Sequence, residues 1–240
     1  MPGVSVDGDC DPVVFNPRTQ ATTRADAVFD PKVDHNRFRR KRFGLFTDQL
    51  KHRFAGATRI RLLDIGGSKA YWQGVEDLWR DFPLHITIVN LEAPAIDDGP
   101  YTLRPGDACA LPEYADNSFD VVHSNSVIEH VGDWARMALM AAEVRRLAPH
   151  HFVQTPYFGF PLEPHFRTLF FHWYPEIVRA QMLMSKKRGF RGPMSTLDAA
   201  MRSVQSVQLL GVRQMAELFP HSRIERERVY GLTKSIMAIS

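Results

Sequence analysis

The chain has 240 residues, enough to bury a full hydrophobic core in one α/β domain. Hydrophobic residues make up 44% and charged residues 24%, a globular mixture, and a formal net charge of +3 does not demand a polyanionic partner. The two cysteines, Cys10 and Cys109, lack metal-binding or disulfide-scaffold spacing, which favours a reducing compartment. The start MPGVSVDGDCDP carries early acids and no apolar stretch, so it is not interpreted as a secretory signal. No apolar run approaches the ~20 residues of a membrane span, so we expect a cytoplasmic protein.

The first part of the chain combines an irregular segment with a basic helical pattern. Residues 1–30 contain many proline, glycine and aspartate residues without periodicity, so we interpret them as a flexible N-terminal arm. From residue 34 phenylalanine and leucine recur at helical spacing until Gly56. We interpret the basic run RFRRKRF at 37–43 as the solvated face of this helix, with contact to nucleic-acid phosphates as the alternative.

Beyond Gly56, short apolar runs alternate with helical patterns. The predicted strands are 59–65, 85–91, 119–125 and 151–158, and the predicted helices are 71–82 and 131–147, followed by helical stretches to about 219. The last residues form two strand patterns joined at Gly231, which predicts an antiparallel hairpin. This order predicts an α/β fold with a mostly parallel sheet and helices on both faces. Ligands of such sheets bind at the carboxyl ends of the strands.

The motif LLDIGGS places Asp64, Gly66 and Gly67 directly after the first predicted strand. Glycine lets the backbone pass close to a ligand, and the following helix start offers N–H groups, although paired glycines are equally typical of an ordinary turn. A carboxylate at this place disfavours a phosphate and favours a cationic ligand. The motif also lacks the G-x-G-x-x-G of dinucleotide-binding folds, which argues against a dehydrogenase.

Two further strand ends carry polar groups. In VNLE, Glu92 can accept both hydroxyl hydrogens of a ribose, whereas Asn90 can accept one hydrogen bond and donate another; the sequence leaves the choice open. In GDACALP, Asp107 can accept a hydrogen bond from an adenine amino group, and the Ala108 N–H can reach a ring nitrogen. Taken alone, Asp107 is more typical of a turn.

Together LDIGGS, VNLE, GDACALP, NSFDVVHSNSVIEHV and the terminal hairpin resemble the class I S-adenosylmethionine-dependent methyltransferases, in the small-molecule, methyltransferase type 11-like group. The resemblance covers about residues 60–156 and the last 30 residues. It implies a Rossmann-like, seven-stranded, mostly parallel sheet ending in the hairpin, in a single domain over 31–240. It also implies S-adenosyl-L-methionine as cofactor and S-adenosyl-L-homocysteine as product.

The resemblance assigns cofactor contacts to the strand ends. Asp64, Gly66 and Gly67 would frame the methionine end, Asn90 or Glu92 would hold the ribose, Asp107 and Ala108 would read the adenine, and Ser124, Asn125 and Ile128 would line the site under the sulfonium. One position departs from the family pattern. Its glycine loop commonly has another glycine where this chain has Ser68, whose φ is less free to be positive, so cofactor affinity would suffer.

Methyl transfer to a hydroxyl needs alignment and benefits from a general base. The candidates are His130 in SNSVIEHV, and Glu163 and His165 in FPLEPHF, just past a predicted strand. The alternative is that these side chains pack or satisfy backbone groups; His172, among aromatic residues, is interpreted as packing. Neither an HEXXH motif nor a tight cluster of ligand residues in the sequence specifies a metal, so none is predicted.

The segment 157–208 is interpreted as a substrate cap or insert because it begins with a dense run of proline and aromatic residues. Tyr157, Phe160, Phe166 and Trp173 are its candidate substrate contacts, with a hydrophobic homodimer patch as the alternative. We therefore expect O-methylation of a small molecule or glycan. The alternatives are a non-catalytic S-adenosylmethionine-binding module and an RNA methyltransferase using the basic helix. The chain lacks the Asp/Asn-Pro-Pro-aromatic signature of DNA amino-methylation, so no DNA partner is expected.

Overall fold

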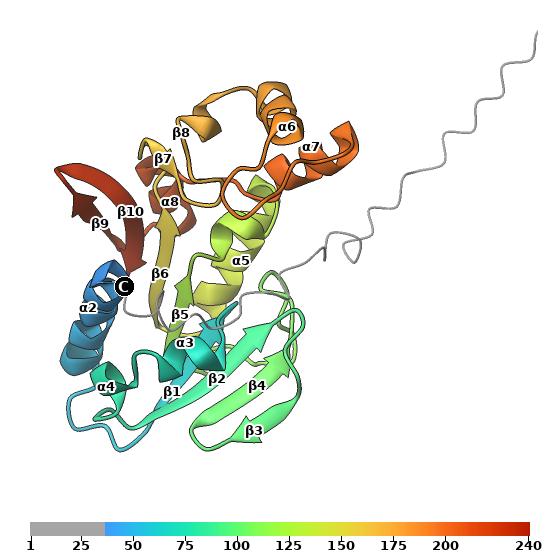
Figure 1. Ribbon diagram of the computed structural model, residues 1–240. Helices are drawn as coiled ribbons and strands as arrows, with labels where there is room; N and C mark the ends of the chain where they lie inside the picture. Colours follow the sequence, from blue (N-terminus) through green and yellow to red (C-terminus); the bar gives the residue numbers. More distant parts are fainter. Residues whose placement is uncertain (1–36) are drawn as a thin grey trace, which may run out of the picture.

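The computed structural model describes residues 37–240, so the predicted arm at 1–30 lies outside the described residues. Eight strands form one sheet in the order β3-β4-β2-β1-β5-β6-β10-β9 (Figure 1). The strands are β1 (Ile60–Ile65), β2 (Leu84–Asn90), β3 (Ile96–Asp98), β4 (Tyr101–Pro105), β5 (Val121–Asn125), β6 (His150–Pro156), β9 (Arg223–Val229) and β10 (Leu232–Ile239).

The middle of the sheet is parallel and its two edges are antiparallel. Strands β4, β2, β1, β5 and β6 pair in parallel, whereas β10 pairs antiparallel with both β6 and β9. The predicted fold class and the C-terminal hairpin are therefore confirmed. Within residues 37–240 the sheet has eight strands rather than the seven that the resemblance implies, because short β3 pairs antiparallel with β4 at the far edge. Neither β3 nor β4 was predicted.

The larger helices cover both faces of the sheet, and shorter ones connect the strands. The helices are α2 (Arg37–Arg53), α3 (Lys69–Gln73), α4 (Glu76–Trp79), α5 (Trp134–Leu147), α6 (Glu176–Ser185), α7 (Leu197–Gln205) and α8 (Val212–Leu218), with 3₁₀ turns η2 (Ile128–His130) and η3 (Phe171–Trp173). The helix predicted at 71–82 is two short helices, since α3 ends at Gln73, with Gly74 as its C-cap, and α4 begins at Glu76.

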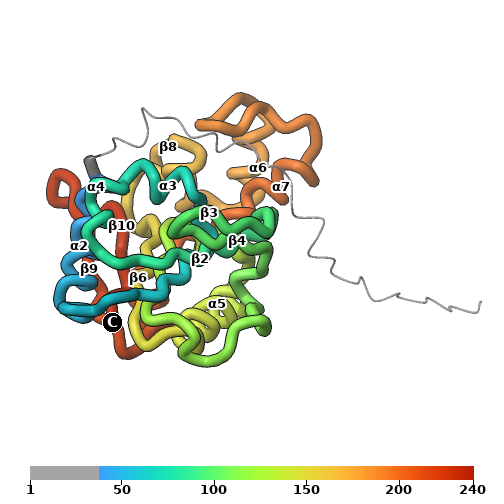
Figure 2. The backbone as a smooth tube through the Cα atoms, turned by 90° about the horizontal axis from the view of Figure 1, so that it is seen from below, coloured from blue at the N-terminus to red at the C-terminus, as the bar shows by residue number. Residues whose placement is uncertain are grey.

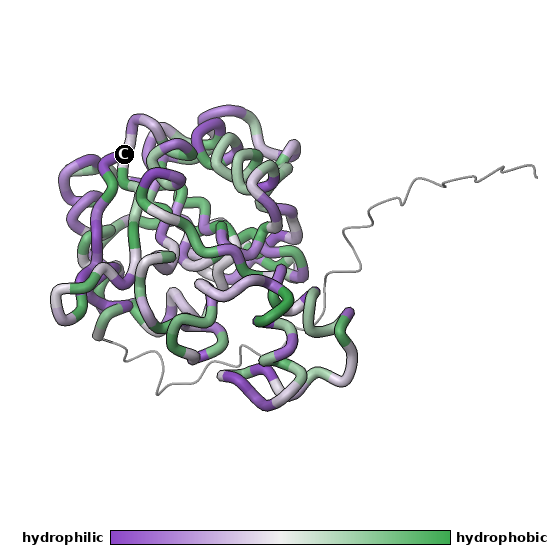
Figure 3. Tube along the Cα trace, turned by 90° about the horizontal axis from the view of Figure 1, so that it is seen from above, coloured by the Kyte–Doolittle hydropathy of each residue, from purple (hydrophilic) through white to green (hydrophobic). Residues whose placement is uncertain are grey.

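Alternating strand residues feed two hydrophobic cores, one on each face. Ile60 and Leu62 of β1 pack with α2, α3 and α4, while Leu63 and Ile65 pack with α5 and α8. This period of two is the pleat of a strand buried on both sides. In Figure 3, hydrophilic colour marks many outer loops, whereas hydrophobic segments run through the middle of the molecule.

Helix α2 carries the basic run that the sequence left ambiguous. Arg40 pairs with Asp77 at 2.5 Å, and Arg42 pairs with the buried Glu227 at 2.8 Å. Phe43 and Phe46 on the same helix are at most 1% exposed. The helix is therefore amphipathic, with apolar residues in the core and two of its arginines bound to acids of the same chain, as the preferred interpretation predicted.

The segment between β6 and α8, which we name the cap lobe after its predicted role, has a small core of its own. It contains the two-stranded sheet β7 (Leu162–Glu163) and β8 (Thr168–Leu169), together with η3, α6 and α7. Phe166, Phe171 and residues of α6 and α7 form its core. Figures 1 and 2 both show α6 and α7 lying apart from α2. Within 37–240, no helix is long and apolar enough to cross a membrane.

Candidate active site

The glycine loop after β1 is held between β2 and the segment after β5. Gly66 has a φ of +75° and its N–H donates to the Val89 carbonyl at 2.7 Å. A Cβ on Gly66 would lie 2.5 Å from Val127 Cγ2, and a Cβ on Gly67 would lie 1.6 Å from Asp64 Oδ2. Both positions therefore require glycine for steric reasons, and Gly66 requires it for its backbone conformation as well.

Asp64 lies beneath this loop rather than in it. It is 1% exposed, and its two carboxylate oxygens contact His123 Nδ1 at 2.8 Å and the Trp72 indole N–H at 2.7 Å. Asp64 and His123 are register partners on the parallel strands β1 and β5, which explains their contact. The role of Asp64 at the methionine end of the cofactor stays a prediction, and in the structure its carboxylate is bound by His123 and Trp72.

Ser68 does not need the conformational freedom of glycine. Its φ is −144°, and its hydroxyl caps α3 by accepting a hydrogen bond from the Tyr71 N–H at 3.2 Å. Serine is a favoured residue at such a helix start. The expected loss of cofactor affinity from this departure therefore has no backbone cause.

The two ribose candidates at the end of β2 have different surroundings. The half-buried Asn90 donates from Nδ2 to the carbonyls of Gly66 and Gly67 at 3.4 and 3.2 Å, so it ties the glycine loop to β2. Glu92 follows in the turn and is exposed. Asn90 thus keeps its carbonyl oxygen as an acceptor, and Glu92 keeps a whole carboxylate.

The carboxylate of Asp107 forms an ion pair with a side chain of this same chain. Arg136 Nη2 contacts both of its carboxylate oxygens, at 3.0 and 2.8 Å, and the Cys109 N–H donates to it at 2.9 Å. Burial by itself raises the pKa of Asp107, but the hydrogen bonds from Arg136 and Cys109 outweigh it and leave the pKa below its usual value. Asp107 is therefore ionised and held in place. It forms a turn at the sheet edge with the adjacent half-buried Ala108.

Cys109, beside this turn, is almost completely buried. Burial is the main cause that raises the pKa of its thiol to about 11. Its Sγ lies 3.3 Å from the Arg136 carbonyl oxygen. The sulfur is therefore a protonated, packed group in the turn.

The three residues predicted to lie under the sulfonium differ in how deeply they are buried. Ser124 is fully buried and its hydroxyl donates to the Ile65 carbonyl at 3.2 Å, while Ile128 belongs to the main core. Asn125 at the end of β5 is half-buried. Next to it Ser126 has a φ of +58°, a conformation that is strained for a residue other than glycine. Ser124 and Ile128 are thus buried beneath the end of β5, whereas Asn125 is partly exposed there.

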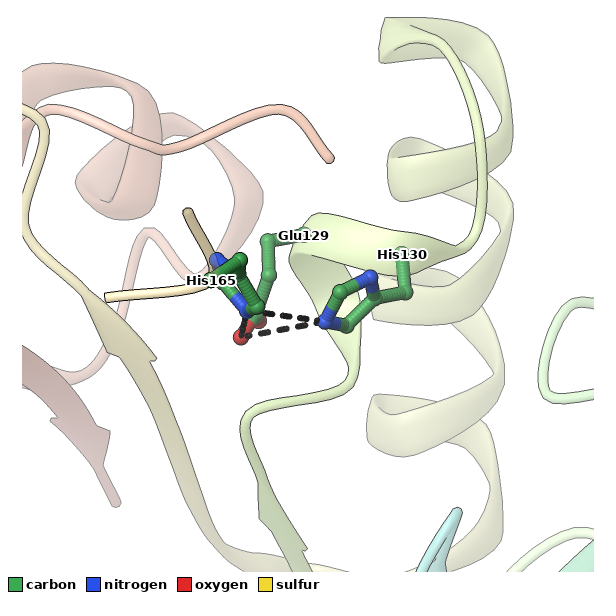
Figure 4. A group of neighbouring side chains, drawn as sticks. All are labelled: Glu129, His130 and His165. Atoms are coloured by element: carbon green, nitrogen blue, oxygen red, sulfur yellow. Dashed lines mark hydrogen bonds and ion pairs between the residues drawn. The ribbon is translucent and has the colours of Figure 1, made fainter. Parts of the chain in front are cut away.

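The three predicted catalytic residues come together, and a fourth joins them. His130 Nε2 lies 3.1 Å from His165 Nε2, and Glu163 Oε1 lies 2.7 Å from His165 Nδ1. Glu129 Oε1 lies 3.9 Å from His130 Nε2 and 4.0 Å from His165 Nε2. Figure 4 shows Glu129 and His130 on the turn η2 after β5, with His165 arriving from the cap lobe. The cap and the sheet edge therefore meet at this cluster.

Glu129 was not recognised from the sequence. It is fully buried, and Thr155 of β6 donates a hydrogen bond to its Oε2 at 3.0 Å. The signal that could have found it is an acid directly after the apolar pair Val127–Ile128, because a carboxylate buried with such residues must find polar partners inside the fold. The sequence specified no metal ligands, and a group of possible ones was missed for a related reason. His165 lies 35 positions from His130, and only the folded cap joins the ligand atoms, all within 4.8 Å of one another.

The aromatic residues predicted to line a substrate site lie in different places. Phe166 is buried and lines a cavity of about 180 Å³ with Phe158, Glu163 and Arg179. Tyr157 and Phe160 are half-buried, whereas Trp173 is 46% exposed. His172 is buried as predicted, with Nε2 2.7 Å from the Phe158 carbonyl, and it also lines the cavity.

Comparison with known proteins gives one sequence match and a set of similar folds. Residues 70–150 match the family described as "Methyltransferase domain". No curated protein sequence matches the chain. Among solved structures, Haemonchus contortus phosphoethanolamine N-methyltransferase 2 with S-adenosyl-L-methionine shares 20% identity over 77% of this chain, with a TM-score of 0.45. The CurJ carbon methyltransferase shares 10% over 79%, with a TM-score of 0.47.

This chain spans 38% and 50% of the lengths of those two proteins. The family match covers the segment from α3 to the start of β6, which contains Asn90, Asp107 and the turn η2. Residues 70–150 are therefore similar to the methyltransferase-domain family, in agreement with the resemblance of the strand-end motifs.

Proposed function

We propose that this protein transfers a methyl group from S-adenosyl-L-methionine to a hydroxyl of a small molecule or glycan. The observation that carries the proposal is the convergence of the glycine loop, Asn90 and the Asp107 turn at the carboxyl edge of the parallel strands, next to the cluster of Glu129, His130, Glu163 and His165. Ligands of parallel α/β sheets bind at this edge. The family match over 70–150 supports the same reaction class.

The strand-end residues fit an adenosyl ligand chemically. Gly66 and Gly67 leave the loop backbone without side chains, Asn90 and Glu92 offer acceptors for a ribose diol, and the Asp107 turn offers a carboxylate for an adenine amino group. Asn125 is the proposed contact beside the sulfonium, with Ala108 beside the adenine. S-adenosylmethionine, when bound, supplies a methyl group already activated by its positive sulfur.

The histidine cluster gives the acceptor hydroxyl a place to lose its proton. Glu163 is 1% exposed and faces His165 Nδ1 at 2.7 Å, so the carboxylate holds the ring with Nδ1 as donor and Nε2 directed away from Glu163. We propose His165 as the base, Glu163 as its positioning residue and His130 as the group that orients the acceptor. A general base of this kind contributes about 10²–10⁴-fold to the rate.

The cap lobe is the proposed source of acceptor contacts. The segment 157–208 carries His165 and the cavity of about 180 Å³ that Phe166 lines. We propose Tyr157 and Phe160, at the start of this segment, as acceptor contacts, and the exposed Trp173 as a contact at its surface. We propose that the lobe folds over the acceptor after the cofactor has bound at the sheet edge.

The proposal is tested in two separable steps. Calorimetry with S-adenosylhomocysteine measures cofactor binding, which we expect at micromolar Kd; alanine in place of Asn90 should weaken it more than alanine in place of Glu92, because Asn90 also holds the glycine loop. Formation of S-adenosylhomocysteine with a panel of hydroxylated acceptors then measures transfer. His165→Gln should lower kcat about 10²–10⁴-fold and leave cofactor Kd unchanged, whereas exposed His221→Gln should change neither.

Two results would contradict the proposal. Absence of S-adenosylhomocysteine binding to the folded chain would remove the reaction class altogether. Binding without turnover of any acceptor, including amines and carbon acids, would instead favour a non-catalytic S-adenosylmethionine-binding module. A methylated amine or carbon product would keep the enzyme and replace the hydroxyl acceptor.

A further inference from the structure

We propose that Glu129, His130 and His165 form a binding site for one divalent transition-metal ion, with zinc as the best-fitting ion. Two imidazoles and one carboxylate are a ligand set that Zn²⁺ uses in proteins, with further positions left for water or a substrate oxygen. The three residues come from two separate parts of the chain, η2 and the loop between β7 and β8. Figure 4 shows their ligand atoms directed toward one another.

The distances between the ligand atoms suit a common ion. Two ligands held about 2.0–2.1 Å from a tetrahedral zinc lie about 3.3 Å apart. His130 Nε2 and His165 Nε2 are 3.1 Å apart. Glu129 Oε1 is 3.9 and 4.0 Å from them, so a shift of its carboxylate by about 0.7 Å would complete the same geometry.

The outer nitrogen of each ring is already fixed by an acceptor. His165 Nδ1 faces the Glu163 carboxylate at 2.7 Å, and His130 Nδ1 faces the Ser206 carbonyl at 3.1 Å. We assign each Nδ1 as the N–H donor, which leaves Nε2 of each ring as the atom that an ion would bind. A carboxylate or carbonyl behind the histidine is the usual support of a metal ligand, because it fixes the tautomer and the ring orientation.

The burial of Glu129 makes a cation favourable at this place. Its carboxylate is 0% exposed, and Thr155 donates to Oε2, which leaves Oε1 on the side of the two rings. A buried carboxylate is costly unless a positive charge or hydrogen bonds compensate it. A divalent ion between Glu129 Oε1 and the two Nε2 atoms would place a positive charge beside this buried carboxylate.

The ion would also give the proposed transfer another way to activate its acceptor. A hydroxyl oxygen bound to a divalent ion is more acidic than a free one. The ion and a proton would use the same Nε2 lone pairs, so in the loaded protein His165 would act as a ligand rather than as a base. This consequence rests on the proposed function, whereas binding of the ion does not.

The test uses the whole chain after dialysis against a chelator. Calorimetric titration with ZnCl₂ should give one equivalent with a Kd in the micromolar range or below, and CoCl₂ should give the absorption bands of a tetrahedral site. His130→Gln and His165→Gln should each weaken zinc binding at least 100-fold. Glu163→Gln changes the group that faces His165 Nδ1 and leaves the three proposed ligands in place, so it should weaken zinc binding about 10–100-fold.

Matched measurements keep the outcome clear. The variant His221→Gln removes an exposed histidine elsewhere on the surface and should bind zinc like the native chain. Circular dichroism of each variant verifies the fold. Zinc binding that stays unchanged in both His130→Gln and His165→Gln, or no binding below millimolar zinc, would overturn the proposal. Because S-adenosylhomocysteine binding is measured on the same samples, loss of the metal site and failure of the cofactor site are separate results.

Discussion

Gly66 and Gly56 both adopt a left-handed backbone, with φ of +75° and +77°, but their surroundings differ. A Cβ on Gly66 would collide with Val127, whereas nothing lies within 4 Å of a Cβ on Gly56. Alanine should therefore cost about 1–2 kcal/mol of stability at Gly56, from the backbone alone. At Gly66 we expect a larger loss and at least a 100-fold weaker binding of S-adenosylhomocysteine, because the loop must move.

Urea unfolding and calorimetry on the two alanine variants measure these effects. Gly56→Ala is the control, since it carries the same backbone penalty away from the strand ends. Equal cofactor binding by both variants would show that the loop after β1 takes no part in holding the ligand.

Single residues also mark the limit of sequence interpretation. The strand-end motifs located the glycine loop, Asn90 and the Asp107 turn, because the position of a residue at the end of an apolar run can be read directly. The sequence could not show that Asp64 is turned under the loop, because that depends on the register with His123 on another strand. Glu129 was not predicted for a similar reason, because its contacts come from β6 and the cap lobe.

At the scale of elements, β6 carries a buried histidine that makes the fold sensitive to acid. His151 is 5% exposed, and its Nε2 lies 2.7 Å from Ser222 Oγ, just before β9. Burial, with a smaller contribution from Arg145, lowers its pKa to about 4. The fold thus favours the neutral ring, while the unfolded chain binds a proton near pH 6.5.

The contribution of His151 to stability is therefore present above pH 6.5 and is lost as the pH falls from 6.5 to 4. A difference of this size corresponds to about 3 kcal/mol over the whole window. Urea unfolding measured from pH 7.5 to pH 4 should show this slope, and His151→Gln should flatten it. An unchanged slope in His151→Gln, with His221→Gln as control, would mean that His151 is not the responsible group.

The elements themselves were predictable to different degrees. Long apolar or periodic segments such as β1, β5, β6 and α5 were predicted almost to their ends, since burial on both faces leaves a clear pattern. The β3–β4 hairpin was missed because its strands are short and polar, although Asp98–Gly99 is a turn signal between them. The prediction of one continuous helix at 71–82 was wrong, because α3 stops before Gly74.

At the scale of the whole molecule, the cap lobe should open independently of the sheet. Its core around Phe166 and Phe171 is small and separate from the two cores of the sheet. Small cooperative units with few buried contacts open at lower free energy than the global fold. In hydrogen exchange, amides of α6 and α7 should exchange faster than those of β1 and β5, and S-adenosylhomocysteine together with an acceptor should slow them. Equal protection of lobe and sheet would contradict this.

The buried thiol of Cys109 allows the opening of the turn around it to be measured. The thiolate, not the thiol, attacks an alkylating reagent, and a sulfur that is packed against Arg136 with a pKa of about 11 is almost never a thiolate near neutral pH. The rate at which a pulse of iodoacetamide labels this sulfur is therefore limited by how often the turn beside the sheet edge comes apart. Mass spectrometry of the labelled peptide would follow that event in dilute or crowded samples, with no dye attached and no residue exchanged.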